Sequence, residues 1–306
     1  MTQEENNITG GIAQEHISRE TTLFAEPVYH HQNLTITNAL ITSWVAVIII
    51  VILSLVVRSK LKEIPKGIQN FFEVIVEGAL SLCDQVTNDR KLSVKIFPIA
   101  ISVFVFILVN NWIGLVPLGG LGLLERGKEG LSFISFLRGG TADINTTLAL
   151  AIMAVIGANV FGVFSIGLWK TFNKYVNIRV LGDIWKKVRK EPTVILVAPI
   201  TFFVGLIEIV GEFAKVASLS FRLFGNVFAG EVLLVSMAAL VGYVVPIPFI
   251  FLEILVGVIQ ALIFSILLVV YFTIGASDHD EEHHSETNLI EDIEEMEKGN
   301  QEVSTV

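Results

Sequence analysis

The chain has 306 residues, of which 53% are hydrophobic, and its mean hydropathy is +0.68. This composition excludes an ordinary soluble domain and indicates an integral membrane protein. The formal net charge of -9 belongs to the last thirty residues, where eleven Asp or Glu accompany one Lys, so the rest shows no basic surface suited to nucleic acid. One cysteine, Cys83, excludes an internal disulfide.

The chain begins with a polar segment, residues 1–38, which lacks the basic stretch and apolar run of a cleavable signal peptide. A spanning helix needs about 20 mostly apolar residues, and the first such run is 39–57. Residues 63–88 differ, because apolar residues recur at helical spacing while Gln69, Glu73 and Glu77 lie on another face. This pattern predicts an amphipathic helix on the membrane surface.

Four further apolar segments follow, at 95–118, 146–170, 193–244 and 247–275; Asn110 and Asn111 interrupt the first of them. A turn at Pro246 and Pro248 separates the last two, because proline ends helices. As one helix, 193–244 would measure roughly 75 Å against about 30 Å of hydrocarbon, so we expect a long tilted hairpin, with Pro199 as one candidate bend. The predicted fold is an all-α polytopic membrane protein with five crossing helices and one amphipathic helix.

The distribution of Lys and Arg predicts the orientation. The N-terminal tail has one such residue, 58–95 has seven, 119–144 has three, 170–190 has seven, and the Pro246 turn has none. The alternation places the N-terminus outside and both seven-charge loops in the cytoplasm. Five crossings then leave the C-terminus inside, with 276–306 as an acidic cytoplasmic tail that we expect to be disordered.

Arg222 is the residue that most needs an explanation. It lies deep in the apolar 193–244 segment, where a cation costs a few kcal/mol on insertion scales and roughly 10 or more in simulations. Arginine cannot escape this cost by losing its proton. At about 100° per residue, four small residues share its face: Gly211, Ser218, Gly225 and Ala229. Such a strip lets another helix approach closely; ordinary packing is the alternative, but it requires no cation.

Further polar residues lie around the same hairpin. Glu208 shares the face of Arg222, whereas Glu231 lies about 180° away and faces the other arm. That arm carries Glu253 and Gln260 on one face. Intramembrane carboxylates usually mark ion or proton paths, while a lone buried Gln fits a structural hydrogen bond equally well. If the two glutamates of the two arms approach each other, like charge and poor solvation favour protonating one of them.

Asp143 precedes the 146–170 span and has two open interpretations. It can cap that helix, or it can lie at the mouth of a channel. His279, His283 and His284 lie in the acidic tail, where we expect solvated residues rather than a metal site. The sequence contains no phosphate-cradling or nucleophile motif. We therefore expect no cofactor, no metal and no catalysis by this chain alone.

Four blocks of the sequence resemble subunit a of the F-type ATP synthase, the stator of its proton channel. The most specific block is 218–231, SLSFRLFGNVFAGE, and the others are 97–117, 141–150 and 260–271. The likeness extends from about residue 16 to 275. It is weak before residue 39 and absent in the acidic tail, and the 119–140 loop looks longer than is usual in the family.

The resemblance implies a role for each matched residue. Arg222 would face the rotating ring of c subunits. Glu208 would belong to the half-channel that opens to the cytoplasm, and Asp143 would lie near the outer vestibule. The half-channel from the outside to the ring would be lined by Asn226, Glu231, Glu253 and Gln260. Family members often pair a Glu with a His at the positions of Glu231 and Glu253, whereas both are Glu here.

The resemblance also implies the partners and the location. They are the c-subunit ring, the b-subunit stator stalk, the remainder of the ATP synthase and membrane lipid, in the inner (plasma) membrane. Two alternatives stay open at this point. A self-contained secondary transporter would use Arg222 to bind an anionic substrate, although we find no internal repeat. In a membrane scaffold, the charges would only fix helix packing.

Overall fold

The computed structural model describes residues 25–31, 34–60, 67–115, 122–127, 130–135, 138–168, 194–241 and 244–276. These residues form two compact units. Unit 1 comprises the described parts of 1–153 and 215–269, and unit 2 comprises those of 154–214 and 270–306. The predicted tail beyond Ala276, with its three histidines, and most of the N-terminal segment lie outside the described residues.

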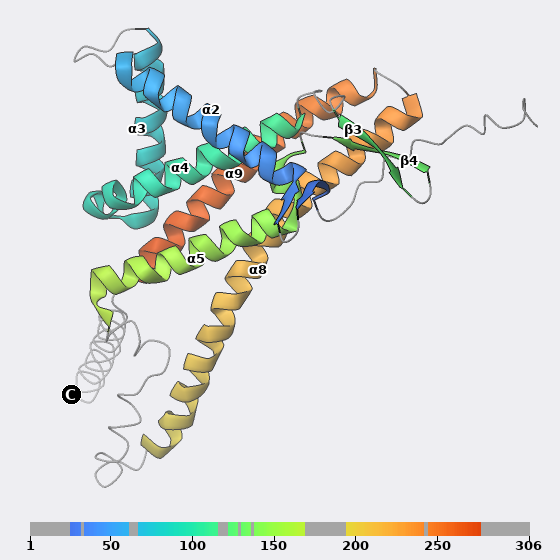
Figure 1. The fold of residues 1–306 in the computed structure, drawn as a ribbon. Coiled ribbons are helices and arrows are strands. Elements are labelled where there is room, and N and C mark those ends of the chain that lie inside the picture. Colours follow the sequence, from blue (N-terminus) through green and yellow to red (C-terminus); the bar gives the residue numbers. More distant parts are fainter. Residues whose placement is uncertain are drawn as a thin grey trace, which may run out of the picture. The chain divides into compact units, whose positions relative to one another are not determined.

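Six α-helices make up most of the part of the chain that the structure describes (Figure 1). They are α2 (Asn38–Lys60), α3 (Ile68–Thr87), α4 (Arg90–Leu115), α5 (Ile144–Ile166), α8 (Val194–Val241) and α9 (Pro246–Ala276). All except α3 contain a segment long and apolar enough to cross a membrane. The prediction of an all-α polytopic membrane protein with five crossing helices and one further helix is therefore confirmed.

Helix α8 is continuous over 48 residues, which corresponds to about 72 Å at 1.5 Å per residue. The helix continues past Pro199, although proline lacks the N–H that would donate to the preceding turn. Helix α9 begins at Pro246, a first-turn position that tolerates proline because no intrahelical acceptor exists for its missing N–H. The backbone N–H of Ile247 donates to the carbonyl of Val244, which closes the turn.

Helix α3 packs against α4 in unit 1, and a tight turn joins them. Asn88 ends α3 in the left-handed conformation with φ 53°, and its N–H donates to the carbonyl of Asp84; Asn is one of the residues that adopt this conformation at helix ends. The Asp84 carboxylate pairs with Arg90 at the start of α4. The nearby polar side chains of Ser93 and Arg90 hold the pKa of Asp84 below its usual value, against the opposing effect of desolvation.

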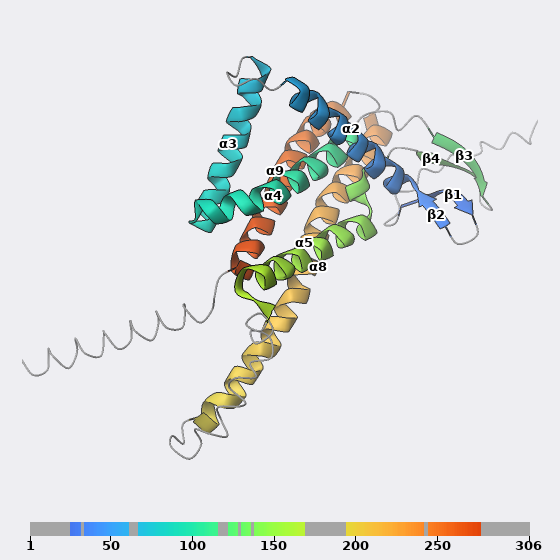
Figure 2. The ribbon, with the colours of Figure 1, turned by 60° about the vertical axis from the view of Figure 1, so that its left-hand side comes forward.

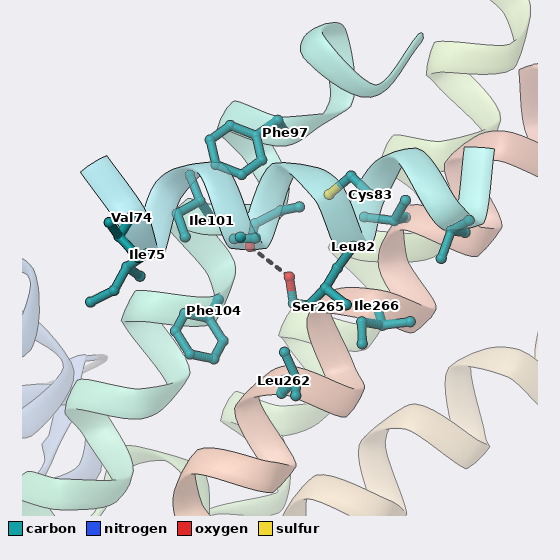
Figure 3. Close-up of a pocket in the computed structure, with 15 residues that line it drawn as sticks. Val74, Ile75, Leu82, Cys83, Phe97, Ile101, Phe104, Leu262, Ser265 and Ile266 are labelled. Carbon is teal, nitrogen blue, oxygen red and sulfur yellow. Dashed lines mark hydrogen bonds between the residues drawn. The ribbon is translucent and has the colours of Figure 1, made fainter. Parts of the chain in front are cut away.

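An apolar cavity of about 240 Å³ lies between α3, α4 and α9 in unit 1 (Figure 3). Leu82 and Phe104 line it, and Cys83 lies at its wall. Burial raises the pKa of the Cys83 thiol, with a smaller contribution from the charge of Asp84. The hydroxyl of Ser265, also on the wall, donates to the carbonyl of Ala100 at 2.9 Å. The lining is therefore apolar apart from this satisfied hydroxyl and the Cys83 thiol.

Two short antiparallel hairpins, which the sequence analysis did not predict, flank the helices (Figure 2). Strands β1 (Pro27–His31) and β2 (Leu34–Thr37) precede α2, and β3 (Gly122–Gly127) pairs with β4 (Gly130–Ser135) between α4 and α5. A 3-10 turn, η2 (Gly140–Ala142), leads into α5. The second hairpin accounts for part of the long 119–140 loop, and neither hairpin changes the helical fold class.

Candidate functional site

Arg222 lies on an exposed face of α8 in unit 1. Ser218, Gly225 and Ala229 on that face are exposed as well, and we call these four residues the Arg222 strip. A Cβ built at Gly225 would meet no atom within 4 Å. The Arg222 guanidinium Nη2 donates to the Ser218 hydroxyl at 3.4 Å, and no described carboxylate forms an ion pair with it. This part of the predicted strip is therefore open, and its cation has no counter-charge from the described part of the chain. Gly211, the fourth small residue of the prediction, is half-buried and belongs to unit 2.

A different side of α8 is buried in unit 1. Leu219 and Leu223 are almost fully buried there, and the hydroxyls of Ser220 and Thr147 lie 3.3 Å apart. Thr147 belongs to the first turn of α5. The side of the helix that carries Arg222 is thus distinct from the side that packs inside the molecule.

One helical turn beyond Arg222, α8 makes a polar contact with α9. The side-chain amide of Asn226 donates to the Gln260 Oε1 at 2.6 Å. Gln260 is only 2% exposed, and its Nε2 has no hydrogen-bond partner among the described residues. The structure thereby brings together two of the residues predicted for the outer half-channel.

A second contact between these helices joins Gly230 and Glu253. A Cβ built at Gly230 would overlap the carboxyl group of Glu253, so a side chain at position 230 would displace that carboxyl. Glu253 is half-buried. The carboxyl of Glu253 thus lies over the residue that precedes Glu231, as expected for glutamates on facing arms of a hairpin.

Glu231 forms an ion pair that the sequence analysis missed. The Nε of Arg138 donates to the Glu231 Oε2 at 3.1 Å, and the side chains are 6% and 30% exposed respectively. In the sequence, Arg138 counts only as one of the three basic residues of segment 119–144. The available signal was its position, because Arg138 and two glycines directly precede the block 141–150, one of the four that carry the family resemblance.

The backbone that follows Arg138 is anchored to α4 and, through it, to α9. The Thr141 hydroxyl donates to the Asn111 Oδ1 at 2.6 Å, and the Asn111 Nδ2 donates to the carbonyl of Gly257 at 3.3 Å. Gly114 lies so close to Gly139 that an added Cβ would be 2.9 Å from the Gly139 Cα. The asparagine that interrupted an apolar run is therefore a buried cross-link between three elements.

Asp143 acts as the cap of α5. Its extended backbone conformation ends η2, and its Oδ1 accepts hydrogen bonds from the backbone N–H of Asn145 at 3.4 Å and of Ala25 at 3.3 Å. Its Oδ2 accepts from the hydroxyl of Thr146 at 3.2 Å. Asp143 is 4% exposed. The capping interpretation is confirmed, because the carboxylate satisfies donors at the helix start.

Glu208 lies in unit 2, whereas the other six predicted site residues lie in unit 1. It is half-buried on α8. Unit 2 contains another intramembrane glutamate that the sequence analysis missed. The Asn159 Nδ2 of α5 donates to the Glu212 Oε2 of α8 at 3.2 Å, and also to the carbonyl of Val155 at 3.0 Å. Its signal was the spacing of four from Glu208, which puts both carboxylates on one side of the helix.

Comparison with known proteins decides the family. The sequence profile described as "ATP synthase A chain" matches residues 40–273. The "ATP synthase subunit a" of Trichlorobacter lovleyi is 32% identical over 234 residues, which cover 76% of this chain and 85% of that protein. The chain belongs to the ATP synthase A chain family. The subunit a of Syntrophobacter fumaroxidans is 34% identical over 78% of this chain and 83% of its own length. The chloroplastic subunit a of Stigeoclonium helveticum is 32% identical over 79% of this chain and 85% of its own length.

As a member of the ATP synthase A chain family, the chain is a multi-pass membrane protein and a proton-translocating subunit in the membrane sector of an F-type ATP synthase. It is therefore one component of the ATP synthase complex. The alternative of a self-contained secondary transporter has no support from these relatives.

Proposed function

We propose that this chain forms two offset half-channels against a rotating ring of c subunits, and that Arg222 faces the ring between them. The observation that carries the proposal is the open Arg222 strip: a cation and three small residues on the exposed side of α8. A permanent charge at membrane depth needs a polar or charged partner. Small residues beside it allow the helix of another chain to approach closely.

The charge of Arg222 makes the protonation state of a ring carboxyl depend on whether that carboxyl faces lipid or Arg222. A carboxyl on the ring is neutral while it faces lipid, because a bare charge there is too costly. In front of Arg222 the carboxylate is favoured, so the proton leaves. Arg222 also repels a cation that would pass straight from one half-channel to the other. Proton passage therefore requires the ring to turn. Water near the guanidinium keeps this attraction from becoming a dry ion pair that holds the ring.

The outer half-channel, in this proposal, runs along the facing sides of α8 and α9. Asn226, Gln260, Glu231 and Glu253 lie there. The amides of Asn226 and Gln260 pair across the two helices, Glu231 pairs with Arg138, and the Glu253 carboxyl lies against Gly230. The buried Nε2 of Gln260 supports a wet path, because channel water would satisfy a donor that the described residues do not. Asp143 belongs to the outer vestibule through its family position, in addition to its role as a cap.

Glu208 is assigned to the half-channel that opens to the cytoplasm, on the strength of its family position. We add Glu212 to that assignment, because the amide of Asn159 holds its carboxylate within the apolar part of unit 2. The N-terminus lies outside and the C-terminus in the cytoplasm of a plasma membrane, as the Lys and Arg distribution predicts. The b-subunit stalk would hold this chain still, and catalysis takes place in other subunits.

Substitution of Arg222 tests the proposal. In membrane vesicles that carry the whole complex, Arg222→Ala should abolish ATP-driven proton pumping, while ATP hydrolysis by the detached soluble sector persists. Arg58→Ala is the matched control, since Arg58 is exposed at the end of α2 and away from the strip. Normal coupled pumping by Arg222→Ala would contradict the proposal that Arg222 faces the ring between the half-channels.

A further inference from the structure

We propose that the apolar cavity between α3, α4 and α9 is a lipid site: it takes an acyl chain of a membrane phospholipid whose phosphate binds Arg90. The proposal goes beyond the proposed function, because none of the residues assigned to the half-channels lines this cavity. All lining residues belong to unit 1, as does Arg90, so the whole site lies within one compact unit.

The cavity opens through exposed apolar side chains (Figure 3). Among the lining residues, Cys83, Ala100 and Ser265 are buried, whereas Val74 and Leu262 are 62% and 38% exposed. The opening lies where the lining is exposed, and two of the three walls, α4 and α9, are long and apolar enough to cross a membrane. Apolar side chains exposed at that depth contact lipid. The cavity therefore opens toward the hydrocarbon of the bilayer.

The lining and the size of the cavity exclude water and a partner helix as occupants. A buried water needs two to four polar partners, but the Ser265 hydroxyl already donates to the carbonyl of Ala100. One turn of an α-helix with its side chains occupies about 500 Å³, more than the cavity volume of about 240 Å³. An apolar cavity of about 150 Å³ already binds benzene. The cavity is therefore large enough for part of an acyl chain and too small for a helix.

Gly78 of α3 marks the space that a bound chain would fill. It lines the cavity, and a Cβ built on it would meet no atom within 4 Å. Packed proteins leave few such spaces, because atoms that face a void lose their dispersion contacts. A chain lying against Gly78 would supply those missing contacts.

Arg90 provides the charge that complements a phosphate. It begins α4 and lies seven residues before Phe97 and fourteen before Phe104, so all three share one side of the helix; both phenylalanines line the cavity. The Arg90 side chain is 59% exposed, and among the described residues its guanidinium pairs only with Asp84, through Nη1. Its other N–H groups can bind a phosphate, which the guanidinium matches in charge and in geometry.

Photocrosslinking of the whole ATP synthase complex tests the cavity. The complex is placed in phosphatidylglycerol vesicles that contain some phosphatidylglycerol with a diazirine in one acyl chain, and the adducts are mapped by mass spectrometry. We expect adducts on the segments of α3 and α4 that line the cavity. Gly78→Leu should reduce these adducts roughly tenfold, because its side chain displaces two or more methylene groups of the bound chain.

The effect of Gly78→Leu needs a control for the added side chain itself. Leucine favours a helix more than glycine does, so α3 and the complex should still form. Ser54→Leu is the matched control, because it adds the same side chain at an exposed position of α2 that does not line the cavity. It should leave the adducts on α3 and α4 unchanged.

A second pair of variants tests the phosphate contact. Arg90→Gln should lower the adducts of the phospholipid probe several-fold, because the guanidinium is lost. It should not change the adducts of adamantyl diazirine, an apolar probe without a phosphate. Asp84→Asn is the control, since it breaks the same ion pair but keeps the guanidinium, and it should leave both yields unchanged.

Three results would overturn the proposal. Equal adduct yields in the wild type and in Gly78→Leu, at normal assembly, would show that no chain enters the cavity. Adducts on α2 with none on the lining segments would mean that a side chain of another subunit fills it. Equal losses in Arg90→Gln and Asp84→Asn would show that Arg90 only supports the turn. If Gly78→Leu does not assemble, the wild type decides: adducts enriched on the lining segments over α2 support a bound chain, and equal labelling contradicts it.

Discussion

Two neighbouring regions of α8 differ in whether their charged side chains contact charged groups of the same chain. Arg222 lies on an open face, and the described part of the chain offers it one hydroxyl, that of Ser218. Less than three turns further on, Glu231 is paired with Arg138, and Glu253 rests on Gly230. The first charge is presented to something outside the chain, whereas the second set is arranged within it. Exposure therefore separates the group that we propose acts on a moving partner from the groups that we propose line the path.

A substitution that blocks the exposed Arg222 strip should have the largest effect on proton pumping. Gly225→Leu adds a side chain where nothing within the chain lies within 4 Å of the new Cβ, so the fold should persist while the partner helix is kept away. We expect ATP-driven proton pumping to be lost almost completely, at a normal amount of assembled complex. Full pumping by Gly225→Leu would mean that the strip faces no partner.

A larger side chain at the contact between Gly230 and Glu253 should have a smaller effect on proton flux. It should also lower the stability of the protein. Gly230→Ala places a methyl group where the Glu253 carboxyl lies, and we expect a cost of about 1–3 kcal/mol, as for other overpacked sites. Thermal unfolding of the purified complex and proton flux should both decrease. Adding Glu253→Ala should restore the stability, because the overlap is gone, but it should not restore the flux. Recovery of both would show that Glu253 has no part in the path.

The α3–α4 turn lies outside both regions and should give the smallest effect. The lowered pKa of Asp84 means that its contribution to stability is complete above the unfolded-state value of about 3.9 and is lost as pH falls through the lower folded-state value. Asp84→Asn should remove this acid dependence, as measured by hydrogen exchange of the Asn88 N–H, which bonds to the carbonyl of Asp84. Pumping near neutral pH should not change. A pumping defect would link this turn to the proton path.

The open region was easier to predict than the internal one. Arg222, Ser218, Gly225 and Ala229 fall on one side of a helix by local periodicity alone, and that arrangement survives in the structure. Arg138 could not be connected with Glu231 in this way, because 93 residues separate them. The two hairpins were also missed, since short strands flanking the apolar spans give a weak signal compared with twenty-residue apolar runs.

The sequence by itself determined what each helix must satisfy locally. Apolar runs of sufficient length set the five spans, the prolines at 246 and 248 set the turn, and helical spacing set which residues share a face with Arg222. The tertiary structure alone decided which polar groups meet. Asn226 with Gln260, Glu253 with Gly230 and Arg138 with Glu231 are joined across elements. Such pairs depend on how helices pack and where a loop is anchored, and a period along one helix contains no information about either.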